Sequence, residues 1–106
     1  IAFDSKGNLW IQTDGKYSNS GKFAGMGNNQ MLCANPRTGE ISRFLVGPKE
    51  CEITGITWSS DKKTMFVGVQ HPGEKNPDSC HFPDGGNSVP RSTVIAITRN
   101  NGRAIG

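Results

Sequence analysis

An internal repeat is the feature of this 106-residue sequence that most constrains its fold. Residues 1–14 are echoed by residues 56–70: in both stretches an apolar segment with an aromatic residue precedes a polar turn and a second apolar segment. The echo continues between residues 31–39 and 94–102, and a further apolar stretch follows the first copy. Repeated units of four short strands are typical of the blades of a β-propeller.

Turn residues separate the expected strands. The first copy places strands at 1–4, 8–13, 30–35 and 41–46, and the second places them at 52–59, 64–70 and 92–99. The composition agrees, because 14 glycines, 6 prolines and only 33% hydrophobic residues suit short strands and turns better than helix bundles. We therefore predict an all-β chain of about two four-stranded antiparallel propeller blades, blade one at about 1–46 and an incomplete blade two at about 52–106.

The same pattern predicts only part of a propeller. Aromatic residues at matching positions of the two copies are expected to form the core between the blades; they are Phe3, Trp10, Trp58 and Phe66. The chain begins with Ile1 instead of Met, already inside a strand pattern, so we expect it to be cut from a longer protein. A two-blade piece leaves strand edges unpaired, and we expect such a piece to self-associate.

Composition and charge exclude several classes of function. The sequence has no run of about eighteen apolar residues, so we expect no membrane-spanning helix. The net charge is +3, and no block of Lys and Arg exceeds two residues, which argues against a nucleic-acid partner. Small anionic substrates remain compatible with this charge.

Two long loops and one link are expected on the same face of the sheets. They are residues 14–29, residues 71–91 and residues 47–52. Functional groups concentrate on loops that a rigid scaffold carries. Glu52 begins the innermost strand of its blade and Asp14 ends a strand of the other blade, so both carboxylates are candidate ligands for Ca²⁺ or Fe³⁺. The alternatives are that Asp14 caps a turn with Gly15 and that the loops are solvated surface.

His71 opens the second long loop. It is a candidate for contacting a phosphate group or for supporting residues that do so. With Cys80 and His81 it could also bind a metal ion, although their spacing matches no standard zinc site.

Several segments, taken together, resemble the C-terminal part of the PhoX-type bacterial alkaline phosphatases. The resemblance rests on FDSKGNLWIQTDG at 3–15, GNNQML at 27–32, CEITGI at 51–56, QHPGE at 70–74 and PRSTV at 90–94, which follow the order of the family. The segments span nearly the whole chain.

The resemblance implies a propeller enzyme that is exported by the twin-arginine route to the periplasm or beyond the cell. Such enzymes hydrolyse phosphomonoesters with calcium and ferric iron. Applied to this chain, the resemblance implies Glu52 and Asp14 as metal ligands and Arg91 as a substrate-binding residue, beside His71, which its loop position already makes a candidate. The substrate and the rest of the propeller would be the partners. Most of the metal site would lie outside these residues, so we expect the isolated chain to be inactive.

Two other functions fit the same strands. One is a non-catalytic β-propeller that serves as a binding scaffold, and the other is a calcium-dependent propeller lactonase or esterase. A scaffold has no need of Asp14 and Glu52 on one face, so that pair of carboxylates favours an enzyme. Substrate assays on the full-length protein separate the two enzyme classes.

Overall fold

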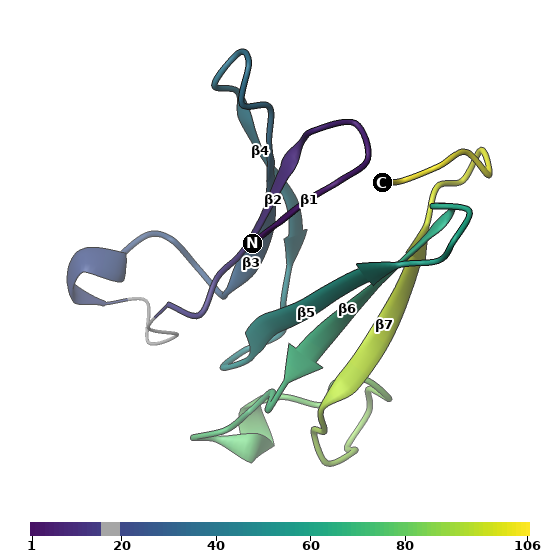
Figure 1. Ribbon diagram of the computed structural model, residues 1–106. Helices are drawn as coiled ribbons and strands as arrows, with labels where there is room; N and C mark the ends of the chain where they lie inside the picture. Colours follow the sequence, from purple (N-terminus) through teal and green to yellow (C-terminus); the bar gives the residue numbers. More distant parts are fainter. Residues whose placement is uncertain (16–19) are drawn as a thin grey trace.

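The computed structural model describes residues 1–15 and 20–106, which form two antiparallel sheets side by side (Figure 1). The first sheet has the order β1 (Ala2–Phe3), β2 (Leu9–Gln12), β3 (Gln30–Ala34) and β4 (Ile41–Val46); the second has β5 (Glu52–Trp58), β6 (Thr64–Gln70) and β7 (Thr93–Thr98). The short 3₁₀ helices η1 (Gly21–Phe23) and η2 (Pro77–Ser79) lie in the two long loops. The described residues contain no α-helix, and none of their helices is long and apolar enough to cross a membrane. The predicted all-β chain of blade-like antiparallel sheets is confirmed.

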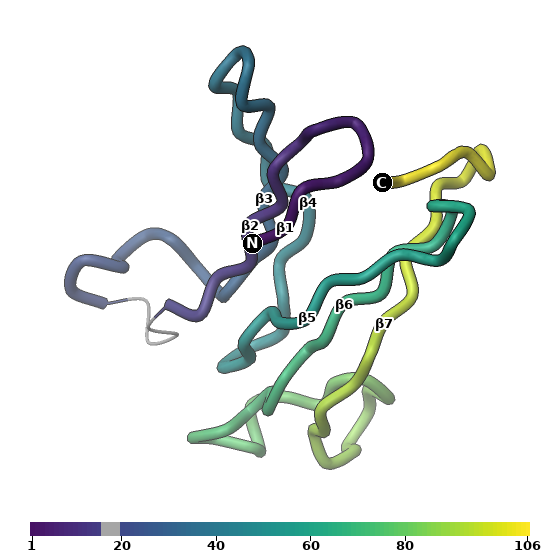
Figure 2. The backbone as a smooth tube through the Cα atoms, in the orientation of Figure 1, coloured from purple at the N-terminus to yellow at the C-terminus, as the bar shows by residue number. Residues whose placement is uncertain are grey.

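The backbone places short turns and long loops at opposite ends of the sheets. In Figure 2 the β1–β2, β3–β4 and β5–β6 turns lie at the upper end, and the loops with η1 and η2 and the β4–β5 link lie at the lower end. Residues 16–19 of the first predicted loop lie outside the described residues. Successive strands of an antiparallel sheet run in opposite directions, so every second connection returns to the same end of the sheet. The short turns and the long loops therefore lie at different ends.

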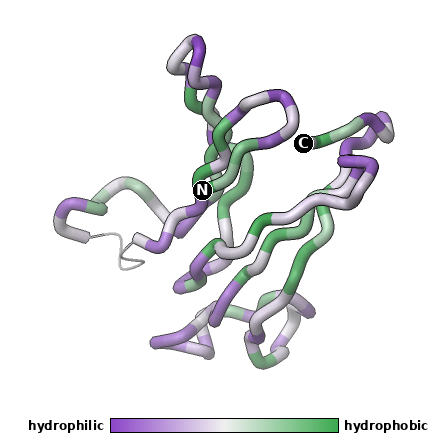
Figure 3. Tube along the Cα trace, viewed as in Figure 1, coloured by the Kyte–Doolittle hydropathy of each residue, from purple (hydrophilic) through white to green (hydrophobic). Residues whose placement is uncertain are grey.

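The hydrophobic core lies between the two sheets. Trp10 and Met31 come from the first sheet, and Ile53, Met65, Val67 and Val69 come from the second. Met31, Met65 and Val67 are fully buried, and burial of each such side chain contributes about 1.5–3 kcal/mol. Hydrophobic residues follow β6 and β7 in Figure 3, while hydrophilic residues gather at the turns and loops.

Of the four aromatic residues expected in the core between blades, two pack between these sheets and two lie on outer faces. Trp10 is 4% exposed, and Trp58 packs against the core. Phe3, in contrast, is 62% exposed, because it pairs with Leu9 and therefore faces away from Trp10. Phe66 stands between buried Met65 and Val67, so its side chain lies on the outer face of the second sheet.

One β-bulge accompanies an aromatic pair within the first sheet. Met31 pairs with Leu45 while Leu32 pairs with Arg43, so Phe44 is the extra residue of β4. Its ring meets the ring of Trp10 edge to face, with centroids 4.9 Å apart and planes at 85°. Aromatic pairs of this geometry are favourable beyond the area that they bury.

Asn29 joins the sheets at the end where the long loops lie. Its Oδ1 accepts hydrogen bonds from Thr13 Oγ1 at 2.9 Å and from Gly15 N at 2.7 Å. Its Nδ2 donates to Gly15 O at 3.0 Å and to Cys51 O at 2.9 Å. Asn29 is 5% exposed, so it is a buried amide with two donated and two accepted bonds. The first sheet is thereby tied to the residue that precedes β5.

Gly47 lets the link between the sheets pass close to the core. A Cβ at this position would collide with Cys51 Sγ and would lie 2.8 Å from Ile53 Cδ1. The amide of Gly47 donates to Asn29 O at 2.9 Å, and its carbonyl accepts from Asn28 Nδ2 at 3.0 Å. A larger residue would therefore push the link away from Asn29.

Asp4 holds the turn between β1 and β2. Its carboxylate accepts from Lys6 N, Asn8 N, Asn8 Nδ2 and Trp10 Nε1 at 2.9–3.0 Å. Burial by itself would raise the pKa of Asp4, but these hydrogen bonds outweigh it and lower the pKa below the ordinary value of 3.8. The equivalent turn of the second sheet contains Asp61, which is exposed and bonds Ser59 and Lys63.

The first prediction concerns Asn29. Replacing it with Ala removes four hydrogen bonds and leaves buried donors and acceptors without partners, so the free energy of unfolding should fall by about 2–4 kcal/mol. Asn28→Ala is the matched control, because its side chain donates one bond, to Gly47 O, and should lose less than about 1 kcal/mol. Denaturant melts of both variants measure the difference, and equal losses would contradict the role given to Asn29.

The second prediction concerns acid stability. Because the pKa of Asp4 is lowered in the folded state, its contribution is complete above about pH 4 and is lost as the pH falls through the lowered value. Asp4→Asn should destabilise the protein by about 1–3 kcal/mol at neutral pH, since an amide cannot accept all four bonds. The difference from the parent should shrink below pH 4 in urea melts. Asp61→Asn should show a much smaller effect at either pH.

Candidate functional site

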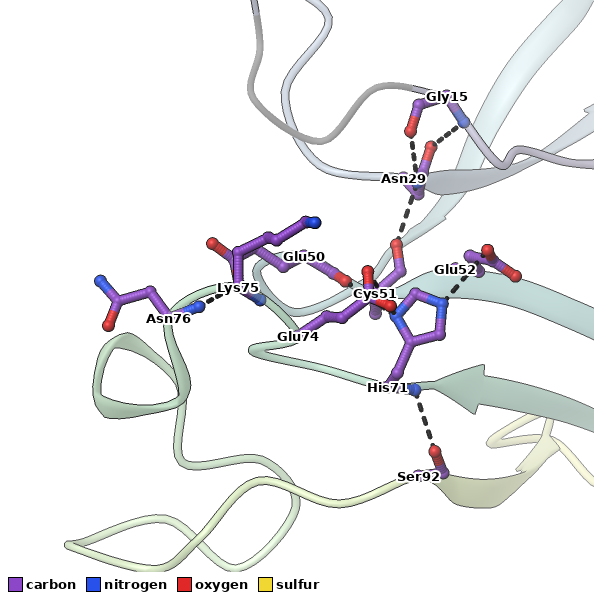
Figure 4. A network of polar contacts seen from close by, with 10 residues as sticks. All are labelled: Gly15, Asn29, Glu50, Cys51, Glu52, His71, Glu74, Lys75, Asn76 and Ser92. Carbon is purple, nitrogen blue, oxygen red and sulfur yellow. Dashed lines mark hydrogen bonds and ion pairs between the residues drawn. The ribbon is translucent and has the colours of Figure 1, made fainter.

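Four titratable side chains converge at the end of the sheets where the long loops lie. We call Asp14, Glu52, His71 and Glu74 the acidic cluster. Asp14 follows β2, Glu52 is the first residue of β5, and His71 follows β6. Glu52, His71 and Glu74 come together from the link and the second long loop in Figure 4.

The backbone brings Asp14 to Glu52. The amide of Ile53 donates to Thr13 O at 3.4 Å. Asp14, which follows Thr13, and Glu52, which precedes Ile53, are therefore neighbours. Asn29 reinforces the contact, because it binds Gly15 on one side and Cys51 on the other. Consecutive side chains of an extended chain point to opposite sides. Because Cys51 is fully buried, Glu52 is directed away from the core.

His71 contacts oxygen atoms at both ring nitrogens. Nε2 lies 3.1 Å from Glu52 Oε1, while Nδ1 lies 3.2 Å from Glu50 O and 3.7 Å from Glu74 Oε2. Carbonyl and carboxylate oxygens only accept, so this environment favours a ring that carries both protons. Desolvation would lower the pKa of His71, but the hydrogen bond to Glu52 and the charge of Glu74 raise it. These contacts therefore favour the protonated form of the ring.

The backbone of His71 is held in a conformation that side chains rarely adopt. Its φ is +39°, and its amide donates to Ser92 Oγ at 2.9 Å. Glu50, whose carbonyl faces the imidazole, also has a positive φ of +62°. Residues in this region persist only where the surrounding structure holds them, and they are common at functional sites.

The proximity of Glu52 affects the titration of Asp14. Desolvation, a hydrogen bond to Glu52 and the negative charge of Glu52 raise the pKa of Asp14; Glu74 adds to this effect and His71 opposes it. Two carboxylates this close repel each other unless a proton or a cation lies between them.

The donor set of the acidic cluster suits a hard cation, but only as part of a larger site. Carboxylate oxygens are the ligands that Ca²⁺ prefers, and ferric iron also accepts them. Within the described residues, however, no group of three or more His, Cys, Asp and Glu side chains is arranged to hold a metal ion. The pair of Asp14 and Glu52 can therefore supply two ligands, and others have to come from elsewhere. The same finding gives no support to a metal site of His71, Cys80 and His81; His81 Nδ1 contacts Ser88 O at 2.9 Å instead.

Glu50 orders the loop beside the acidic cluster. Its carboxylate oxygen Oε2 accepts from Lys75 N at 2.7 Å and from Asn76 N at 2.9 Å (Figure 4). Nearby, Gly73 N donates to Lys49 O at 2.9 Å. The link before β5 thus holds both His71 and the chain that follows it.

Arg91 lies elsewhere on the second long loop. Its guanidinium pairs with Asp84 at 3.0 Å, and both side chains are more than half exposed. Its amide donates to Phe82 O at 3.1 Å. The structure brings together Asp14, Glu52 and His71 among the residues singled out from the sequence, and the described contacts of Arg91 join it to Asp84.

Sequence reasoning missed the parts played by Asn29 and Glu50. The partners of Asn29 stand up to 22 residues away, and those of Glu50 stand 25 and 26 residues away. No local spacing signals such bonds. The available clue was the glycine-rich loop at 14–29 and the short link at 47–52, which indicate the region without indicating the residue.

The third prediction tests the loop contact of Glu50. Glu50→Ala should free the amides of Lys75 and Asn76, and their hydrogen exchange should accelerate by about tenfold or more, while exchange in β6 stays unchanged. Glu50→Gln retains an acceptor oxygen and should show an intermediate effect. Unchanged exchange of both amides in the alanine variant would show that the loop is ordered by other contacts.

Comparisons with known proteins show which family the chain resembles. The family model described as "Alkaline phosphatase PhoX" matches residues 1–73. Among solved structures, Pseudomonas fluorescens PhoX in complex with vanadate, a transition state analogue, is 60% identical, with a TM-score of 0.88 over 98% of this chain. The chain spans 18% of the length of that protein, as expected for two blades of a larger propeller. A comparison with curated proteins found no match. Because the family model covers more than half of its residues, the chain belongs to the PhoX alkaline phosphatase family.

Proposed function

We propose that the polypeptide to which these residues belong is a metal-dependent phosphatase that hydrolyses phosphomonoesters. The observation that carries the proposal is the placement of Asp14 beside Glu52 by the backbone bond between Thr13 and Ile53, within a chain of the PhoX family. Vanadate in the solved relative is named as a transition state analogue, which supports phosphoryl transfer as the reaction class. The share of the relative that this chain covers supports the rest of the propeller as the source of the remaining site residues.

Asp14 and Glu52 would hold cations, with calcium and ferric iron as the proposed ions. When bound, such ions polarise a phosphoryl group and neutralise its developing charge. Glu52 also accepts a hydrogen bond from His71, which orients the carboxylate. Asn29 and the Thr13–Ile53 backbone bond keep the two carboxylates together before any ion binds.

His71 and Arg91 are the proposed substrate-binding residues. A protonated His71 provides positive charge at the edge of the acidic cluster, where a phosphate dianion needs compensation. Arg91 would bind a phosphate in place of its present partner, Asp84. This exchange costs little, because an exposed ion pair of this kind is weak.

The two alternative functions predict different behaviour at the acidic cluster. A non-catalytic scaffold gains nothing from holding two carboxylates and a strained His71 side by side. A lactonase or esterase would use the same ions on an ester carbonyl and would not be inhibited by vanadate as a phosphoryl analogue. Export to the periplasm or beyond the cell is part of the proposal and rests on family resemblance.

The fourth prediction is the test. Glu52→Gln in the full-length polypeptide should cut turnover of a simple phosphomonoester by about a hundredfold, which corresponds to a few kcal/mol of transition-state stabilisation. The fold should persist, because the amide oxygen can still accept from His71 Nε2. Elemental analysis should show a reduced metal content.

The matched control is Glu40→Gln, since Glu40 is an exposed carboxylate in the β3–β4 turn at the opposite end of the sheet. It should leave turnover and metal content unchanged. Normal turnover with a full metal complement in Glu52→Gln would remove Glu52 from the site. Hydrolysis of lactones but not of phosphomonoesters by the parent would establish the alternative enzyme class.

A further inference from the structure

A cavity lies between the sheets at the end opposite the acidic cluster. Its volume is about 320 Å³, which falls within the range of small-molecule sites. Trp10, Cys33 and Phe44 line it from the first sheet, and Ile97 lines it from β7. These side chains give the cavity apolar walls between the two sheets.

The C-terminal segment covers one side of this cavity. Ile105 lines it, and the amide of Ile105 donates to Lys62 O at 2.8 Å. Ser5 Oγ donates to Gly106 O at 2.7 Å, so the segment bridges the β5–β6 turn and the β1–β2 turn. Figure 1 shows the C-terminus between these two turns. The cavity is therefore built from elements of both sheets.

The charge of the cavity is positive. Lys6 and Arg99 line it and are exposed, so they stand at its opening. Among the described residues, neither side chain has a hydrogen-bond or ion-pair partner. Asp4 also borders the cavity, but its carboxylate already accepts four hydrogen bonds from the turn and from Trp10. Two cations thus stand above apolar walls against the single carboxylate of Asp4, which leaves a net positive charge at the opening.

We propose that this cavity binds a small apolar anion, such as an aromatic carboxylate or sulfonate of one or two rings. The rings would lie against Trp10, Phe44 and Ile97, and the acidic group would face Lys6 and Arg99. Such a ligand complements both the apolar walls and the charge at the opening. The site is separate from the acidic cluster, because the two occupy opposite ends of the sheets.

The experiment uses the full-length polypeptide and the fluorescent probe 1-anilinonaphthalene-8-sulfonate. The probe should bind saturably, and the change of Lys6→Gln together with Arg99→Gln should weaken binding by about five- to tenfold. Its affinity should also fall with added salt. The uncharged relative N-phenyl-1-naphthylamine should bind the parent and the variant equally, because it has no acidic group.

Three controls make the result specific. Lys63→Gln together with Arg37→Gln removes the same charge from exposed residues outside the cavity and should leave probe affinity unchanged. Inorganic phosphate should not displace the probe, and Glu52→Gln should bind it normally. Equal weakening in the two double variants, displacement by phosphate, or loss of binding in Glu52→Gln would each overturn the proposal. The substituted lysines and arginines are exposed, so the variants should fold.

Discussion

The hydrogen bonds of Asn29 are the interaction on which the arrangement of this chain depends. One buried amide binds the end of β2, the start of the first long loop and the residue before β5, using two donors and two acceptors. Buried polar groups are stable only when such requirements are met, so the geometry around Asn29 is specific. Because Cys51 is tied to Asn29, Glu52 has to lie beside Asp14.

The acidic cluster follows from that restraint. Carboxylates in water repel each other, and here the fold holds Asp14 and Glu52 side by side, with His71 and a third carboxylate next to them. The positive φ of both His71 and Glu50 shows that the backbone, too, is held against its preference. Rigid sheets and the hydrophobic core between them supply the stability that this arrangement requires. A propeller blade separates these tasks by placing the core in the strands and the chemistry in the loops.

The two ends of the sheets have different chemical character for the same reason. At one end the long loops bring carboxylates together. At the other end, beside the short turns, Trp10 and Ile97 line an apolar cavity whose opening carries Lys6 and Arg99. The carboxylate of Asp4 also borders this cavity, where four hydrogen bonds from the turn and from Trp10 hold it in place. Alternating strand direction is the common cause, since it sends each class of connection to its own end.

The sequence by itself determined the strands, their order and the end of the sheets that carries the long loops. The repeat and its turn residues predicted each strand to within about two residues, because alternation of apolar segments and turns is a local property. The common end of Asp14, Glu52 and His71 followed from antiparallel topology. Tertiary structure alone decided which face each aromatic residue occupies: Phe3 and Phe66 face outward because of their pairing register. It also decided the bonds of Asn29 and Glu50 and the pairing of Arg91 with Asp84, since contacts between distant residues depend on how the two sheets pack, which no local pattern encodes.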